Sequence, residues 1–245
     1  IVTSQQDIDS IIKVKGNDFS KIQGRFDTRL SLSSANVDAV IKKRILEKND
    51  TAAQTLRLLY GQEETTIKNK IVFTDSVERK LYTGKDDFAA VYPFIPYQFN
   101  LLGSVLTAIR THGASGKHLS EGERSMLAMF KESAVAYMHE QQGTIIPFYA
   151  FYTPMENFLD HSHRSVIIKA YENDYINPDH KTGDVFAINV LKTLFLIKYV
   201  QDMTPNIDNI TTLMMDNLEE DRITLKGKVE EALKILIRQM LVQKN

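Results

Sequence analysis

Residues 185–240 read VFAINVLKTLFLIKYV QDMTPN IDNITTLMM DNLEED RITLKGKVEEALKILIRQM, and this stretch decides the fold class. Apolar residues recur at helical spacing in three blocks, which predicts helices over 185–200, over Ile207–Met214 and from Arg222 onward. The third block carries an apolar stripe made of Leu225, Val229, Leu233, Leu236, Ile237 and Met240. Three helices joined by short turns are typical of helix-turn-helix folds. We therefore expect a winged-helix-like unit that stops before its wing.

The rest of the chain also favours helices, because only 11 Gly and 6 Pro interrupt its 245 residues. Ser34 is placed to cap one helix, and further helices are expected over 51–72 and 77–82. Residues 92–97 contain two prolines, which restrict the residues before them, so we expect a non-helical apolar connector there. The predicted fold is mainly α.

The composition excludes several classes of site and of protein. The chain has no Cys, which excludes disulfides, thiolate-bound zinc and cysteine nucleophiles. Its net charge of −1 does not suit a uniformly basic nucleic-acid-binding protein, although local basic patches remain compatible with it. No apolar run approaches the roughly 18–20 residues of a membrane span, and we expect a cytoplasmic location. The chain starts at Ile1 without Met, in a β-branched run, so we expect an excised part of a longer protein.

The string Gly113-Ala-Ser-Gly116-Lys117-His118 is the nearest approach to a phosphate-binding loop. A Walker A motif places four residues between its two glycines and a Ser or Thr after its lysine. Here the first glycine precedes Gly116 by only three positions, and His118 occupies the Ser/Thr place. We therefore expect no Walker A loop. A loop before a capped helix still attracts anions, so Lys117, His118 and Arg124 are candidate phosphate or DNA contacts, with a solvated turn as the alternative.

Basic residues also mark the last predicted helix. Lys234 and Arg238 are candidate DNA contacts, because the corresponding helix of a winged helix enters the major groove. The alternative is a solvated face on which Glu230 and Glu231 balance the charge.

A metal site near His161 and His163 is the third candidate, with Glu156 and Asp160 as further ligands. Zinc binds His and carboxylate groups. A His-x-His pair between helices lacks the four-residue spacing that places two ligands on one helix face. We expect no metal here, and instead hydrogen bonds that tie one helix end to the next.

Arg25 and Arg29 lie just before the first long predicted helix. Arginines supplied across a subunit boundary stabilise the charge of a transferring phosphoryl group. Surface pairing with Asp27 explains the same residues equally well, and the sequence leaves both interpretations open.

Several strings together carry a resemblance to a known family. They are IVTSQQ (1–6), RFDTRLSLSSANVD (25–38), YPFIPYQF (92–99), HGASGKHLSEGERS (112–125), PFY (147–149) and FLDHSHR (158–164). Over essentially its whole length the chain resembles BrxC, called PglY in related systems, the large P-loop, AAA-type ATPase of BREX bacteriophage-exclusion loci.

The resemblance implies that both Walker motifs lie upstream of Ile1, so that ATP and Mg²⁺ belong to the full-length parent and neither is expected in this chain. It places Thr3 and Ser4 near the sensor-1 position, where a polar side chain helps to place the attacking water. It makes Arg25, and less strongly Arg29, a candidate trans-acting arginine. The implied partners are other BREX subunits, DNA and further copies of the chain, with no membrane.

The resemblance also implies a domain organisation. Residues 1–34 would be the end of the AAA-type core, 35–140 a helical lid and middle region, and 141–245 a helical region that ends in the partial winged helix. The expected function is to couple the nucleotide state to binding of DNA or of a partner subunit. The alternative is a non-catalytic helical scaffold within a defence complex.

Overall fold

The computed structural model describes residues 34–112, 122–159 and 161–243. The described chain is mainly helical, as predicted, and its extended segments form only isolated bridges and no strand. The helices, including two short 3₁₀ turns (η), are α3 (Ser34–Arg44), α4 (Asp50–Lys70), α5 (Lys85–Val91), α6 (Tyr97–His112), α7 (Gly122–Ala136), η1 (Phe148–Phe151), α8 (Tyr152–Met155), η2 (Glu156–Phe158), α9 (His161–Glu172), α10 (Phe186–Ile197), α11 (Ile207–Met214) and α12 (Arg222–Arg238). No described helix combines the length and the apolar character needed to cross a bilayer.

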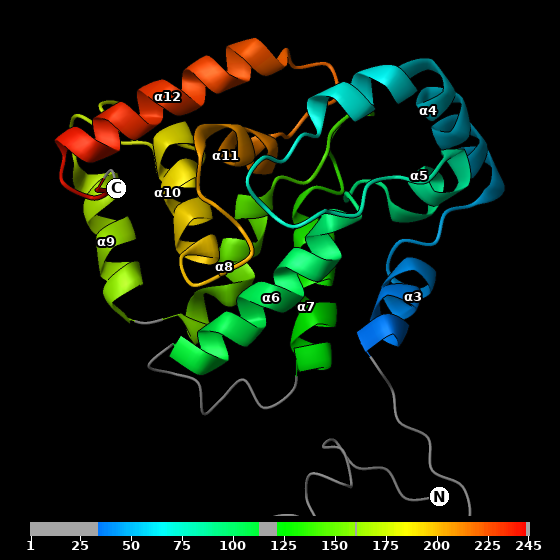
Figure 1. Ribbon diagram of the computed structural model, residues 1–245, viewed down its shortest axis with the longest axis horizontal. Coiled ribbons are helices and arrows are strands. Elements are labelled where there is room, and N and C mark those ends of the chain that lie inside the picture. Colours follow the sequence, from blue (N-terminus) through cyan, green and yellow to red (C-terminus); the bar gives the residue numbers. More distant parts are fainter. Residues whose placement is uncertain (1–33, 113–121, 160, 244–245) are drawn as a thin grey trace, which may run out of the picture.

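The predicted three-helix unit is present as α10, α11 and α12, and the bounds of α11 are those expected from the sequence. Helix α12 lies across the outside of α10 and α11 (Figure 1). Its buried stripe is Leu225, Val229, Ala232 and Leu236. The predicted stripe extended too far, because the helix ends at Arg238 and Met240 is 89% exposed.

The long helix expected over 51–72 is α4, which runs without interruption through Gly61. Asn49 caps it by accepting a hydrogen bond from the Ala52 amide at 2.8 Å. Helix α5 packs against α4, with the rings of Tyr60 and Phe88 in contact at a centroid distance of 5.2 Å.

The connector is non-helical and packed into the core over residues 92–96, as predicted, whereas Tyr97 already belongs to α6. The Tyr92–Pro93 peptide bond is cis. The buried Gln98 at the start of α6 fixes this turn, because its side chain accepts from the Ile95 amide at 3.0 Å and donates to the Ile146 carbonyl at 2.7 Å. The residues around Ile146, just before η1, are therefore held against the connector.

The prediction of a helix over 77–82 is wrong. Residues 71–84, hereafter the 71–84 segment, run in irregular and extended conformations between α4 and α5. The backbone of Thr74 exchanges hydrogen bonds with the buried Asn209 side chain at 2.8 and 2.7 Å. Arg79 donates to the Asp202 carbonyl at 2.6 Å. These tertiary bonds take the place of helical ones, so local propensity does not decide the conformation.

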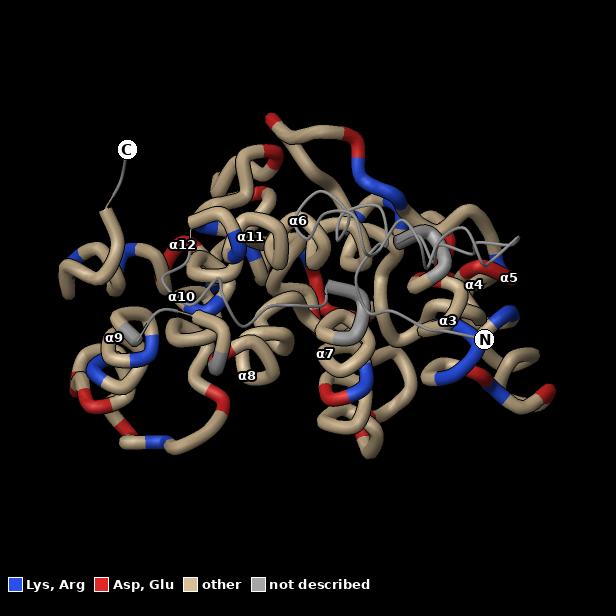
Figure 2. The backbone as a smooth tube through the Cα atoms, turned by 90° about the horizontal axis from the view of Figure 1, so that it is seen from below, with Lys and Arg blue, Asp and Glu red and all other residues tan. Residues whose placement is uncertain are grey.

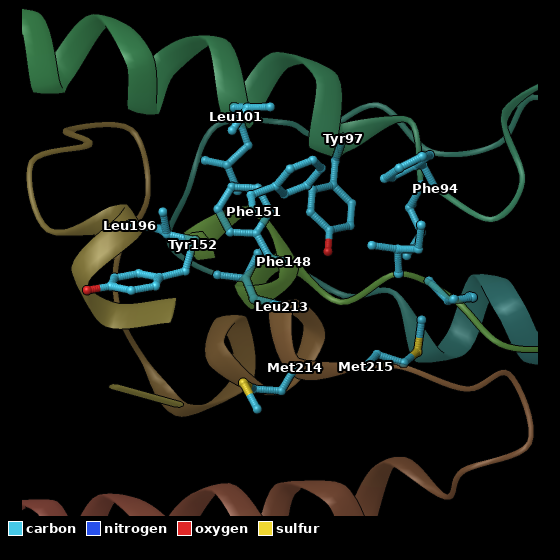
Figure 3. Packing of buried hydrophobic residues seen from close by; sticks show 14 of the residues in the cluster. Phe94, Tyr97, Leu101, Phe148, Phe151, Tyr152, Leu196, Leu213, Met214 and Met215 are labelled. Carbon is cyan, nitrogen blue, oxygen red and sulfur yellow. The ribbon is translucent and has the colours of Figure 1, made fainter. Parts of the chain in front are cut away.

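One hydrophobic cluster extends from α3 to α12. Its centre is aromatic, with Phe94 from the connector and Phe148 and Phe151 from η1 gathered between α6 and α11 (Figure 3). The cluster includes buried side chains from both sides of the predicted boundary at residue 140. The division at that boundary remains a prediction.

Candidate functional site

The candidate nucleotide-site residues lie outside the described part of the chain. Thr3, Ser4, Arg25 and Arg29 belong to residues 1–33. The same holds for Lys117 and His118 in residues 113–121, and Arg124 is described only as a backbone position in the first turn of α7. Their roles therefore remain predictions.

The basic residues of α12 are described, and several lie beside carboxylates. Lys226 pairs with Asp208 of α11 at 2.9 Å, and Lys234 pairs with Glu231 one turn earlier at 2.5 Å. The hydrogen bond with Glu231 raises the pKa of Lys234. Arg238 lies exposed in the last turn. Lys and Arg positions are interspersed with Asp and Glu positions along the described backbone (Figure 2), and Glu230 and Glu231 accompany the basic residues of α12. The outer face of α12 is therefore a mixed-charge surface.

Arg222, at the first position of α12, was predicted only as a helix boundary. Its guanidinium donates to the Lys70 carbonyl at 2.7 Å, to the Thr212 hydroxyl at 2.9 Å and to the Asp208 carbonyl at 3.1 Å. Burial lowers its pKa, although the Asp208 carboxylate, 3.6 Å away, opposes that shift. The side chain thus ties the end of α4 to both α11 and α12.

A group of aromatic and basic side chains lies where α6 ends, at the boundary of residues 113–121. The His112 ring stacks on Tyr199 with a centroid distance of 5.6 Å and an interplanar angle of 26°. The Lys198 ammonium lies 5.0 Å from the centroid of the same tyrosine ring. His163, at the start of α9, packs against Phe195 at 4.5 Å. These contacts bring the ends of α6 and α10 and the beginning of α9 together.

The predicted connection around His163 is present in part. Arg164 pairs with Glu156 at 3.5 Å, which links the start of α9 to η2. Within the described residues, no three His, Asp or Glu side chains are arranged to hold a metal ion.

The described residues also contain a shallow hollow. Tyr60, Ile67 and Ile71 line it from α4 and its end, and Leu81 and Tyr82 line it from the 71–84 segment, leaving an empty volume of about 180 Å³ that includes open solvent. Its lining is apolar apart from the tyrosines and Lys68, which pairs with Glu64 at 2.7 Å.

A scan against models of protein families finds no match to this chain. A search of solved structures finds no significant match either.

Proposed function

We propose that this chain is a helical part of a BrxC/PglY-like ATPase of a BREX defence system. In this proposal the nucleotide is held upstream, and the described helices pass its state to bound DNA or to a partner subunit. The sequence resemblance suggests the family. The observation that carries the coupling role is the attachment of α12, through Arg222, to the end of α4. A displacement of α4 would be transmitted to α12 through these bonds.

Binding of DNA by α12 is tested with the whole chain and a labelled duplex, by fluorescence anisotropy over a series of salt concentrations. The affinity of a phosphate-contacting protein falls with salt, because counterions are released on binding. Removing one such contact reduces the salt slope by about 1. We expect this reduction for Arg238→Ala and Lys234→Ala.

The matched control is Lys68→Ala, since Lys68 is an exposed lysine paired with Glu64 on α4, which lies on the opposite side from the C-terminal end of α12 (Figure 1). This variant should keep the wild-type slope. Equal slopes in all four proteins would remove α12 from the DNA interface.

A second candidate function is a scaffold that binds other proteins. The ion pairs of Lys226 with Asp208 and of Lys228 with Glu220 favour it, because they leave less uncompensated positive charge for phosphate on α12. Absence of measurable binding to duplex DNA at low salt would support this scaffold and contradict DNA coupling.

The trans-acting arginine is tested in the full-length parent. Arg25→Ala should lower the ATP turnover of the assembled protein, with Arg29→Ala as the comparison. Unchanged turnover in the assembled Arg25→Ala protein would eliminate that role.

A further inference from the structure

A lysine that forms no ion pair within the described chain lies where α8, α9 and α10 meet. The Nζ atom of Lys192, on α10, lies 5.5 Å from the ring centroid of Tyr171 on α9 and 5.9 Å from that of Tyr152 on α8. It donates one hydrogen bond, to the Tyr171 hydroxyl, at 3.2 Å. An ammonium group has three N–H donors, so Lys192 keeps further donors for another acceptor.

Tyr152 supplies an independent observation at the same junction. Its side chain is 2% exposed, and its buried hydroxyl has no hydrogen-bond partner. Figure 3 shows the ring at the edge of the core, with the hydroxyl directed away from Phe148 and Phe151. Burying a hydroxyl without a partner costs free energy, which an arriving acceptor would recover.

The protonation of Tyr152 suits a donor. Burial, followed by the negative charge of Glu156, raises its pKa to about 12, so the hydroxyl keeps its proton at neutral pH. Glu156 is itself paired with Arg164. Its carboxylate therefore competes less with a ligand for the hydrogen-bond donors of the junction.

Tyr171 has a different part in the arrangement. Its hydroxyl accepts from Lys192 and donates to the Gly183 carbonyl at 2.9 Å. Its single proton is therefore already used, and the residue holds the lysine in place. Lys192 and Tyr171 are both half-buried, and the hydrogen bond from the Tyr171 hydroxyl to the Gly183 carbonyl lies at the surface.

We propose that Lys192 and Tyr152 bind one phosphate-type oxyanion at the junction of α8, α9 and α10, with Tyr171 as a positioning residue. An ammonium and a hydroxyl are point donors, which suit a tetrahedral oxyanion. Planar carboxylates are matched better by the two parallel donors of a guanidinium group. This site is separate from α12 and does not depend on the proposed function.

The test uses the whole chain, inorganic phosphate as the probe, and sodium chloride to keep the ionic strength constant. Isothermal titration should give saturable binding, and the melting temperature should rise with phosphate because the ligand binds only the folded state. Lys192→Gln should weaken phosphate binding by about tenfold or more, since a hydrogen bond from a charged donor is lost. Circular dichroism checks that the variant is folded.

Tyr152→Phe separates the proposal from a merely structural role. Without phosphate, the variant should melt at the same or a higher temperature, because it removes a buried hydroxyl that has no partner. With phosphate, it should show a smaller rise and a weaker affinity than the wild type. A loss of stability without phosphate, together with an unchanged phosphate affinity, would contradict the proposal.

The matched control is Lys68→Gln, which alters a lysine that lies near the buried Tyr60 and is already paired with Glu64. Its response to phosphate should equal that of the wild type. The proposal fails if wild-type protein shows no saturable phosphate binding, or if Lys192→Gln binds phosphate as tightly as wild type. It also fails if acetate binds as tightly as phosphate.

Discussion

Arg222 supplies the donors for three oxygen atoms in two other elements, so one side chain joins α12 to α4 and α11. Its own side chain is 20% exposed, so the carbonyls of Lys70 and Asp208 depend on it more than on water. A buried carbonyl oxygen that loses its donor still has the free-energy cost of removal from water, and no hydrogen bond then offsets that cost.

We therefore predict that Arg222→Met, which keeps an apolar stem, lowers the free energy of unfolding by about 2 kcal/mol in urea denaturation. Arg57→Met is the matched control, since Arg57 pairs with Asp86 on the surface. That variant should change stability by less than about 1 kcal/mol. Equal losses in the two variants would contradict the role of Arg222.

Lys48 is a second residue whose environment has a measurable consequence. Its ammonium donates to the Tyr92 carbonyl at 2.6 Å, at the end of α5, and burial lowers its pKa to about 8. In the unfolded chain the pKa is near 10.5, so between these two values the unfolded state binds more protons than the folded state. Stability linked to Lys48 therefore increases with pH.

The prediction is that the free energy of unfolding of wild type rises relative to Lys48→Met as the pH increases from about 8 toward 10. The quantity to compare is the slope of the free energy of unfolding against pH. The absolute stability of Lys48→Met is also affected by the loss of the hydrogen bond to Tyr92. Lys43→Met, which alters an exposed lysine on α3, should follow the wild type. A constant difference between wild type and Lys48→Met over this range would show that Lys48 is not linked to stability in this way.

Among the elements, the 71–84 segment depends most on distant residues. The Asn209 side chain accepts from the Thr74 amide and donates to the carbonyls of Thr74 and Thr204. An amide side chain that bonds to both the N–H and the C=O of one residue acts as a neighbouring strand would. The segment is thereby fixed without regular structure of its own.

We predict that Asn209→Ala lowers the free energy of unfolding by about 2 kcal/mol, because buried backbone groups lose their partners. Amide hydrogen exchange should become faster at Thr74 and its neighbours, while the amides of α7 keep their protection. Asn217→Ala is the control, because the half-buried Asn217 side chain accepts from the Glu219 amide two positions on and does not contact the 71–84 segment through any described hydrogen bond. Uniform acceleration along the whole chain would indicate global destabilisation instead.

Some elements are determined by the local sequence, and others depend on distant residues. Helix α4 follows from apolar spacing, since it buries Leu56, Tyr60 and Ile67. The bounds of α11 were also predicted, although its residues 209–214 are all buried and form no single stripe. The helix expected over 77–82 fails, because residues more than a hundred positions away set that conformation. The seven-residue α5 was not predicted, since its stability comes from packing on α4 rather than from its own length.

The candidate sites also depend on contacts between residues that are far apart in the sequence. Lys234 and Arg238 were selected correctly as residues of the last helix, but a sequence does not show the pairing of Lys226 with Asp208, 18 positions earlier. The junction of Lys192 with Tyr152 and Tyr171 was also not predicted, because three separate helices supply its members. Clusters of this kind have no spacing signature.

At the scale of the whole molecule, buried tyrosines determine the behaviour in alkali. Burial raises the pKa of Tyr82, Tyr97 and Tyr149 above the usual value of 10. In the unfolded chain these groups lose their protons first, so above about pH 10 the folded state binds more protons than the unfolded state. Stability then falls as the pH rises.

We predict that the melting temperature decreases above about pH 10 and that tyrosinate absorbance near 295 nm appears together with unfolding. Tyr97→Phe and Tyr149→Phe should each make this decrease shallower. Tyr175→Phe, at a side chain that is 77% exposed, should leave it unchanged. Full ionisation of all tyrosines in protein that remains folded would contradict the prediction.

The attachment of the 71–84 segment has a consequence for biosynthesis. Thr74 and Asn209 are separated by 135 positions. At about 5–20 residues per second, a ribosome needs roughly 7–27 s to synthesise that interval. During this time the segment has left the ribosome, but the side chain that fixes it has not been made. The nascent chain therefore exposes an unpaired, partly apolar stretch, and the segment becomes fixed only after α11 has been synthesised.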